Sequence, residues 1–305
     1  MNMSRRDLFA GVLVTVLWGC NFSVIELGLK TLDPYLLTLL RFTFCAVPLV
    51  FFIRRPVGVS LAVLAGYGAM FGAGLWWMVN FAMYNGLSPG MSSVFLQFSA
   101  FFTIGWSAIF LGERINVVHV GGMAFAVAGL VLMLLGSEPS TSFGILLVLL
   151  AAMAWSLCNL MVKVKRPGQM MAFIIWSSLF SVPVIMLLTV VTQGAAPFAS
   201  LVQGLAWEAL FSIAFQSYVT TLLGYLVWNN LMKKYPATHV APLSLLVPVS
   251  GLLASYLFYE EVLSVAQGLA IGLVLVGIAI FLNAQSLSAF VLSRRAQRSR
   301  VSQGN

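Results

Sequence analysis

The sequence predicts an all-α membrane protein with ten transmembrane helices, arranged as two inverted five-helix repeats around a central cavity. Three observations support this prediction. The composition is too apolar for a soluble fold, the apolar residues form ten runs of membrane-spanning length, and the two halves of the chain resemble each other. Because each half contains an odd number of spans, the second copy must enter the membrane in the opposite direction.

Composition places most of the chain in lipid. Hydrophobic residues make up 61% of the 305 residues and charged residues only 8%, whereas soluble domains are about a quarter charged. The net charge of +8 does not indicate a nucleic-acid site, because the basic residues form short clusters between apolar runs. Cys20, Cys45 and Cys158 lie inside these runs, so we expect no disulfides, no metal and no cofactor.

The apolar runs are long enough to cross about 30 Å of hydrocarbon as helices. A barrel would show short alternating strands instead. The first run follows Arg5 and Arg6, but its length is that of a retained span rather than a cleaved signal. The predicted spans are 8–29, 35–53, 61–84, 90–111, 116–136, 142–162, 170–191, 207–231, 237–258 and 263–283.

The basic residues predict the orientation. If the N-terminus is cytoplasmic, fourteen of the sixteen Lys and Arg residues fall on the cytoplasmic side, as the positive-inside rule requires. The exceptions are Lys30, on the other side, and Arg41, inside a span. One missed helix would reverse every later loop, so this asymmetry predicts ten spans with both termini cytoplasmic.

An internal repeat relates residues 111–133 to residues 259–281 and residues 45–50 to residues 180–185. The matched positions carry Glu, Pro, Gly, Trp and Asn as well as aliphatic residues, which favours duplication over chance. We therefore expect a first repeat at 1–136, a second at 142–285 and a basic cytoplasmic tail at 286–305. The paired residues are Glu113 with Glu261, Gly129 with Gly277, Pro48 with Pro183, Trp18 with Trp155, and Asn21 with Asn159.

Ionisable residues inside spans are expensive to bury and indicate functional sites. Glu26 lies near the outer end of the first span and Arg41 about two turns into the second span from the same side. The two residues are expected to pair, either as a structural link between helices or as part of a site. His239 lies just inside a span, where it would carry a proton or form an interfacial hydrogen bond.

Several spans carry amide side chains interleaved with aromatic rings along their length. Buried amides need hydrogen-bond partners, and this mixture suits a cavity for uncharged or zwitterionic solutes. The alternative is interhelical hydrogen bonding with aromatic belts. The candidate substrate-binding residues are Trp18, Asn21, Trp77, Asn80, Tyr84, Ser93, Gln97, Trp155, Asn159, Tyr218, Tyr225 and Ser244.

Spans five and ten are almost purely aliphatic and carry small residues at four-residue spacing, Gly122 with Ala126 and Gly268 with Gly272. Such spacing permits close helix packing, so these spans are expected to form a scaffold or a dimer face. We expect a monomer, with a dimer through these two spans as the alternative.

The motifs resemble those of the EamA-type drug/metabolite transporters. The resemblance rests on WGCNF (18–22), the stretch from Pro34 to Arg41, the Glu-containing junctions before spans five and ten, and the five-plus-five repeat. Residues 84–106 resemble the bacterial branch that exports aromatic amino acids. One departure is the second junction, which reads YEEV where the first reads LGER, so the resemblance does not extend the bracing role of Glu113 to Glu261.

This resemblance implies a multi-pass transporter in the bacterial inner membrane. Its cavity would be lined by the first four helices of each half, and the fifth and tenth helices would be peripheral. We expect a secondary transporter that exports small metabolites by alternating access, with aromatic or large neutral amino acids as substrates. The alternatives are a carrier of other solutes, such as nucleotide sugars or cationic drugs, and a membrane scaffold or enzyme. The sequence lacks H-E-x-x-H, G-x-S-x-G and P-loop motifs, so we expect no enzyme.

Overall fold

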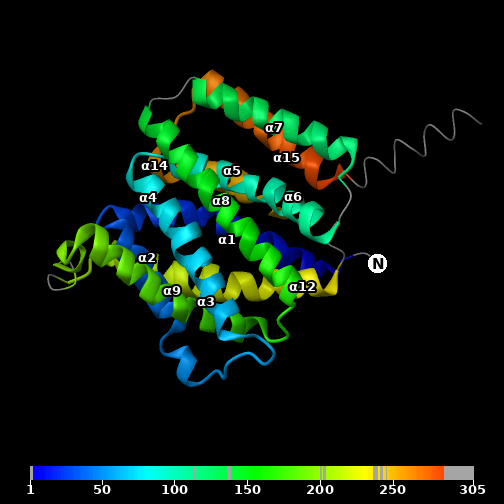
Figure 1. Cartoon of the computed structure of the whole chain (residues 1–305). Helices are drawn as coiled ribbons and strands as arrows, with labels where there is room; N and C mark the ends of the chain where they lie inside the picture. The colour runs from blue at the N-terminus through cyan, green and yellow to red at the C-terminus, as the bar shows by residue number, and fades with distance from the viewer. Residues whose placement is uncertain are drawn as a thin grey trace, which may run out of the picture.

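A computed structural model describes residues 3–112, 115–135, 139–199, 201, 204–235, 240, 243–244 and 246–284. The described residues form helices joined by short loops (Figure 1). Three of the predicted features, Glu113, His239 and the tail 286–305, lie outside them. The predicted ninth span is described mainly from Leu246 onward.

The helices follow the predicted order. The first half contains α1 (Arg5–Leu29), α2 (Pro34–Ala46), η1 (Leu49–Phe51), α3 (Leu61–Ala69), η2 (Met70–Trp77), α4 (Met78–Tyr84), α5 (Pro89–Phe95), η3 (Leu96–Phe98), α6 (Ser99–Leu111) and α7 (Val117–Leu135). The second half contains α8 (Pro139–Lys165), α9 (Met170–Gln193), η4 (Ala196–Phe198), α11 (Trp207–Ala214), η5 (Phe215–Gly224), α12 (Tyr225–Lys234), α14 (Leu246–Tyr259) and α15 (Val265–Leu282).

The described helices are long and apolar enough for a multi-pass membrane protein. Eight helical segments reach at least 18 residues with a composition suited to crossing a bilayer, and two shorter apolar helices, Leu246–Tyr259 and Val265–Phe281, follow them. These ten segments correspond one by one to the predicted spans, which confirms the predicted fold class. The second span differs in detail because Pro48 follows the end of α2 and precedes η1. Proline lacks the N–H that a continuous helix needs at that position.

Local sequence signals begin the helices where they are observed. Ser4, Asp33, Ser60 and Ser88 each accept a backbone N–H of the first turn of the helix that follows. Ser264 does the same for α15 and completes a capping box with Gln267. These polar caps satisfy backbone donors at the helix ends, where no earlier turn can accept them.

The third span of each half contains a π-helical segment at its centre. Residues Met70–Trp77 form η2 between α3 and α4, and residues Phe215–Gly224 form η5 between α11 and α12. A π segment bonds residue i to residue i+5 and changes which side chains share a face. The recurrence of this uncommon element at the same place in both halves is a structural mark of the repeat.

Helices α7 and α15 lie side by side at one edge of the molecule (Figure 1). Their contact uses Gly122, Gly129 and Gly277, where an added β-carbon would meet the backbone of the opposite helix. Gly268 and Gly272 take no part in this contact within the chain, because a β-carbon at either position would meet open space, and their expected role in a dimer face stays a prediction. Small residues at four-residue spacing occur on both faces of α15, and only the fold shows which face packs against α7.

Candidate functional site

Arg41 of α2 lies at the centre of a buried polar cluster. The side chain is fully buried, about 10 Å along the helix from the N-terminal end of α2 at 1.5 Å per residue. Its Nε and Nη2 atoms donate to Thr221 Oγ1 over 3.2 and 2.9 Å, and its Nη1 donates to Gln216 Oε1 over 3.1 Å. Gln216 and Thr221 both belong to η5, so the cluster joins the two halves of the protein.

The π geometry of η5 positions these acceptors. Thr221 Oγ1 donates to the carbonyl oxygen of Gln216, five residues earlier, over 2.7 Å. Gln216 Nε2 donates to Ser212 Oγ over 2.9 Å, which leaves its amide oxygen directed at Arg41. Ser217 Oγ donates to the backbone oxygen of Arg41 over 2.9 Å. The guanidinium is therefore held by neutral groups in a fixed orientation.

The expected ion pair between Glu26 and Arg41 is absent, and this prediction was wrong. Arg41 makes no salt bridge with any described carboxylate, and its guanidinium carbon instead lies 3.8 Å from the centre of the Trp76 ring. A cation over a tryptophan face is a favourable contact in a dry site. Glu26 is only partly buried, near the end of α1. The sequence places Glu26 and Arg41 at a similar depth in their spans, but the fold separates their side chains.

Aromatic rings cover the cluster on the side of α1 and η2. Trp18 donates its indole N–H to the carbonyl oxygen of Thr220 over 2.9 Å, and its ring centroid lies 5.1 Å from that of Tyr225. Phe71 of η2 lies 5.3 Å from Tyr225 in an edge-to-face arrangement. Gly224 permits this approach, because a β-carbon there would lie 2.5 Å from the indole nitrogen of Trp18.

Some buried polar atoms beside Arg41 have no hydrogen-bond partner in the described part of the chain. Asn21 accepts from Thr220 Oγ1 over 3.3 Å through its amide oxygen, but its Nδ2 has no acceptor. The indole N–H of Trp76 is buried and lacks an acceptor at hydrogen-bonding geometry. Buried donors without acceptors are uncommon in folded proteins. Trp76 lies against the Arg41 guanidinium, and Asn21 contacts Thr220, the neighbour of the Thr221 that binds Arg41.

The equivalent residues of the second half lie elsewhere. Asn159 of α8 donates to Thr103 Oγ1 of α6 over 3.3 Å, and Trp155 is partly buried on the same helix. Nearby, Trp106 donates to Ser156 Oγ over 2.9 Å. These bonds link α6 to α8. The repeat thus brings Trp18 and Asn21 to the Arg41 cluster and gives Trp155 and Asn159 a different set of neighbours.

Other predicted site residues form contacts between neighbouring helices. Asn80 donates to Thr38 Oγ1 over 2.8 Å, and Trp77 packs against Phe81 and Tyr35. Gln97 of η3 donates to the carbonyl oxygen of Ser244 over 3.2 Å, which connects the fourth span with the ninth.

Ser93 is fully buried against Gly251 of α14, where an added β-carbon would lie 2.4 Å from Ser93 Oγ. The serine therefore occupies a close helix contact.

Two predicted site residues lie outside the buried core. Tyr84, at the end of α4, is 57% exposed, and Tyr218 is 43% exposed. The α-helical spacing of the eighth span places Tyr218 on one face with Thr221 and Tyr225. The π turns of η5 change that register, so Tyr218 faces away while Thr221 and Tyr225 face Arg41 or its aromatic cover.

Polar contacts close the N-terminal end of α1. Lys234 Nζ and Tyr235 hydroxyl bond to Asp7 Oδ2 over 2.6 and 2.5 Å, and Tyr235 hydroxyl also accepts the backbone N–H of Ser4 over 3.1 Å. The hydrogen bond from Lys234 to the Asp7 carboxylate raises the pKa of Lys234. These bonds tie the first half to the end of α12.

A second set of contacts joins the halves at the opposite end. Glu261 accepts hydrogen bonds from Ser88, the cap of α5, and from Ser255 of α14. Tyr259 hydroxyl donates to the backbone oxygen of Ser23 over 2.8 Å, and Lys30 lies over the Tyr259 ring. Glu261 therefore does brace α5 against α14, although its YEEV junction differs from LGER.

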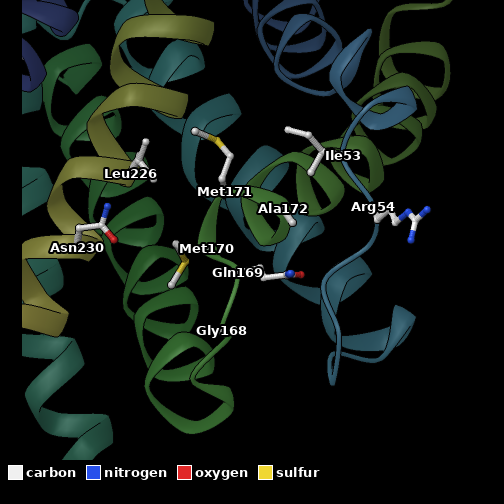
Figure 2. A pocket seen from close by; sticks show the side chains of 9 residues that line it. All are labelled: Ile53, Arg54, Gly168, Gln169, Met170, Met171, Ala172, Leu226 and Asn230. Atoms are coloured by element: carbon white, nitrogen blue, oxygen red, sulfur yellow. The ribbon is translucent and has the colours of Figure 1, made fainter.

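A hollow of about 370 Å³ opens where the second span meets the seventh and eighth. Figure 2 shows Leu226 and Asn230 of α12 on one side, Ile53 and Arg54 on the other, and residues 168–172 between them. The guanidinium of Arg54 points away from the other labelled side chains. The hollow combines methionine and leucine surfaces with amide groups, and Arg54 is the basic residue among those that line it. The described residues contain no cluster of His, Cys, Asp and Glu that could hold a metal ion.

Sequence comparison decides the family. The model of the EamA-like transporter family matches the chain twice, over residues 6–135 and 142–283. The chain belongs to the EamA-like transporter family. The membership makes the chain a transporter rather than an enzyme.

Relatives of this EamA-like transporter include proteins named as probable exporters of amino acids or amino-acid metabolites. The chain is 34% identical to the "Probable amino-acid metabolite efflux pump" of Escherichia coli (strain K12), over 91% of this chain and 95% of that protein. It is 24% identical to the "Probable terminal-alkyne amino-acid exporter" of Streptantibioticus cattleyicolor, over 86% of this chain and 88% of that protein. A solved crystal structure is similar with a TM-score of 0.58 and 21% identity, covering 91% of this chain and 98% of that one.

Sequence reasoning missed several members of the cluster in this EamA-like transporter. Trp76, Thr220 and Phe71 are not distinguished in the sequence from other residues of their apolar spans. Trp76 lies one residue before the predicted Trp77, which turns instead toward Tyr35 and Phe81. No signal in an α-helical spacing could identify these three residues, because all of them lie in the π-helical segments η2 and η5.

Proposed function

We propose that this protein is a secondary exporter of amino acids with aromatic or large neutral side chains, working by alternating access. It would reside in the bacterial inner membrane with both termini in the cytoplasm. The proposal also takes the halves as residues 1–136 and 142–285, followed by the basic tail 286–305. The observation that carries it is the combination of the Arg41 cluster, shared by both halves, with relatives named as amino-acid exporters.

The chemistry of the cluster supports this substrate class. A zwitterionic amino acid needs polar groups for its charged end and apolar surface for its side chain. Asn21, Gln216 and Thr221 supply polar groups, while Trp18 and Tyr225 supply aromatic faces. Aromatic pairs add about 0.5–1.5 kcal/mol beyond the burial of their area. This arrangement favours a substrate with a ring or a long apolar side chain.

The same cluster disfavours the other transport candidates. A nucleotide sugar carries a diphosphate and would require several basic side chains, whereas Arg41 is the one fully buried basic residue in the described part of the chain. A cationic drug would require a buried carboxylate, and none of the described acidic residues is buried. An amino acid fits a site with one cation and several neutral groups.

The hollow of Figure 2 is the proposed cytoplasmic entrance. It lies between the end of the second span, the start of the seventh span and the end of the eighth span. Its mixed lining of Met170, Met171, Leu226, Gln169 and Asn230 suits an amphipathic solute. Alternating access would then open and close the contacts of Asp7 with Lys234 on this side and of Glu261 with Ser88 on the other.

Transport in proteoliposomes tests the proposal. Purified protein is reconstituted, vesicles are loaded with unlabelled phenylalanine, leucine or alanine, and uptake of radiolabelled phenylalanine is followed. We expect counterflow with phenylalanine and leucine inside and little with alanine. A cationic dye and a nucleotide sugar serve as competitors that should not inhibit. Absence of counterflow with every amino acid, together with inhibition or transport of either competitor, would contradict the proposal.

A further inference from the structure

The cluster contains a positive charge that no described side chain neutralises. Arg41 is fully buried, and its three hydrogen-bonded contacts are to the neutral Thr221 and Gln216. Burying a charge without an opposite charge costs several kcal/mol, and arginine stays protonated in proteins. A protein that retains such a cation in its membrane region has a use for it that packing alone does not explain.

The neighbouring groups add donors rather than acceptors. Asn21 Nδ2 is a buried hydrogen-bond donor without an acceptor in the described structure. Trp76 Nε1 is a buried donor whose neighbour, the Tyr225 hydroxyl, is not at good hydrogen-bonding geometry. Both residues contact the Arg41 guanidinium or a neighbour of the residues that bind it. Trp76 lies 3.8 Å from Arg41 in the ring contact, and Asn21 accepts from Thr220, the neighbour of the Thr221 that binds Arg41. One cation and two unfilled donors therefore occupy one region between the halves.

We propose that Arg41, Asn21 and Trp76 form the binding site for the carboxylate of the transported substrate. A carboxylate offers two oxygens with about four lone-pair positions and matches the planar fork of a guanidinium. The hydrogen bonds to the neutral Gln216 and Thr221 orient Arg41 without cancelling its charge. The positive charge therefore remains available to attract a substrate carboxylate. This inference rests on the proposed function, and it assigns the carboxylate end of the substrate to Arg41.

The site also defines what is excluded. An amine that lacks a carboxylate would bring a second positive charge beside Arg41, and like charges in a dry site repel strongly. An amino-acid amide or ester would keep the side chain but lose the anion. The rings of Trp18 and Tyr225 pack together beside the cluster, where the substrate side chain would contact them. The recognised class is therefore monocarboxylates with apolar side chains, among them neutral amino acids.

A competition experiment separates the carboxylate from the rest of the substrate. Binding of radiolabelled phenylalanine to the reconstituted full-length protein is competed with phenylalanine, phenylalaninamide and 3-phenylpropionate. We expect the amide to compete at least about ten-fold more weakly than phenylalanine, which corresponds to about 1.4 kcal/mol. We expect 3-phenylpropionate, which keeps the carboxylate and lacks the amine, to compete. An amide that competes as well as phenylalanine would overturn the inference.

Variants of Arg41 test the same point on the protein. In Arg41→Gln, phenylalanine should bind at least about ten-fold more weakly, and its advantage over the amide should disappear. Arg41→Lys keeps the charge without the planar fork and should retain part of the preference. Arg55 is an exposed arginine in the loop after the second span. The Arg55→Gln variant is therefore the control and should keep the full preference for phenylalanine over its amide. A folded Arg41→Gln protein that still prefers the acid over the amide would contradict the inference.

Two outcomes distinguish this inference from the proposed function. If Arg41→Gln fails to fold, the ligand series on the unaltered protein and on Asn21→Ala decides, because Asn21→Ala should narrow the preference for the acid. If no amino acid binds, ligand-induced thermal stabilisation is measured with 3-phenylpropionate and other monocarboxylates. Stabilisation by a carboxylate would support the anion site and overturn the proposed substrate, whereas its absence with every carboxylate would overturn the anion site itself.

Discussion

Gly122 of α7 packs directly against the backbone of Gly277 in α15. A β-carbon on Gly122 would lie 2.7 Å from the carbonyl oxygen of Gly277, and one on Gly277 would lie 2.6 Å from the carbonyl oxygen of Gly122. Such distances allow the two helices to approach to backbone contact. The fifth and tenth spans therefore form an internal scaffold within one chain.

This contact predicts opposite effects for matched glycine substitutions. Gly122→Ala and Gly277→Ala should lower stability by about 1–3 kcal/mol, because the new methyl group overpacks a backbone contact. Gly268→Ala should instead be neutral or stabilising by up to about 1 kcal/mol, because alanine favours the helix and the site is open. The thermal midpoint of the purified protein in detergent measures both effects. Equal loss of stability in all three variants would contradict the assigned packing face.

The two repeat-related asparagines should differ in their importance for transport. Asn21→Ala removes a donor from the Arg41 cluster and should lower the transport efficiency, kcat/KM, by at least about ten-fold. Asn159→Ala removes a bond to Thr103 and should cost about 1 kcal/mol of stability with transport reduced less than about three-fold. Transport assays on amounts of folded protein matched by chromatography test this difference. Comparable losses of transport in both variants would show that both asparagines act on the substrate.

The contact between Asp7 and Lys234 should contribute to stability in a pH-dependent manner. The pKa of Lys234 is raised by its hydrogen bond to Asp7 above the ordinary value of 10.5. A raised lysine pKa means that the contribution is complete below 10.5 and is lost as the pH rises through the folded-state pKa. Lys234→Gln should therefore lower the thermal midpoint near about pH 8, and the difference from the unaltered protein should vanish at strongly alkaline pH. The exposed Lys165→Gln is the control and should show no such change.

Energy coupling can be tested at Glu26. Glu26 is only partly buried near the end of α1, and none of the described acidic residues is buried in the core, where a coupling proton would have to be carried. We therefore expect facilitated diffusion, with the direction set by the solute gradient. Counterflow should proceed without a pH gradient, and Glu26→Gln should leave its pH dependence unchanged. Accumulation driven by a pH gradient that is lost in Glu26→Gln would make Glu26 the proton-binding residue.

Single-cysteine labelling tests the orientation. A cysteine at Gln193, at the end of α9, should react with an impermeant reagent from outside the cell, while cysteines at Arg55 and Lys165 should be protected. Permeabilised cells provide the control for reactivity at all three positions. Labelling of Lys165→Cys from outside would contradict the proposed ten-span topology.

The spans and the family were predictable because they depend on properties of the sequence that any fold must respect. Apolar runs of about 20 residues cross a bilayer as helices, and capping residues such as Asp33 and Ser88 begin those helices. The candidate site was predictable in part. Trp18, Asn21, Arg41 and Tyr225 were identified from polarity and aromatic character within spans, but their neighbours were not.

The sequence by itself determined a multi-pass helical protein, its repeat and its buried cation. Only the tertiary structure decided that Arg41 binds Gln216 and Thr221 rather than Glu26, and that α15 uses Gly277 rather than Gly268 for packing. The physical reason is that hydrophobicity and charge act locally along the chain. The partner of a side chain depends on contacts more than 170 residues apart and on π turns that shift the register of η2 and η5.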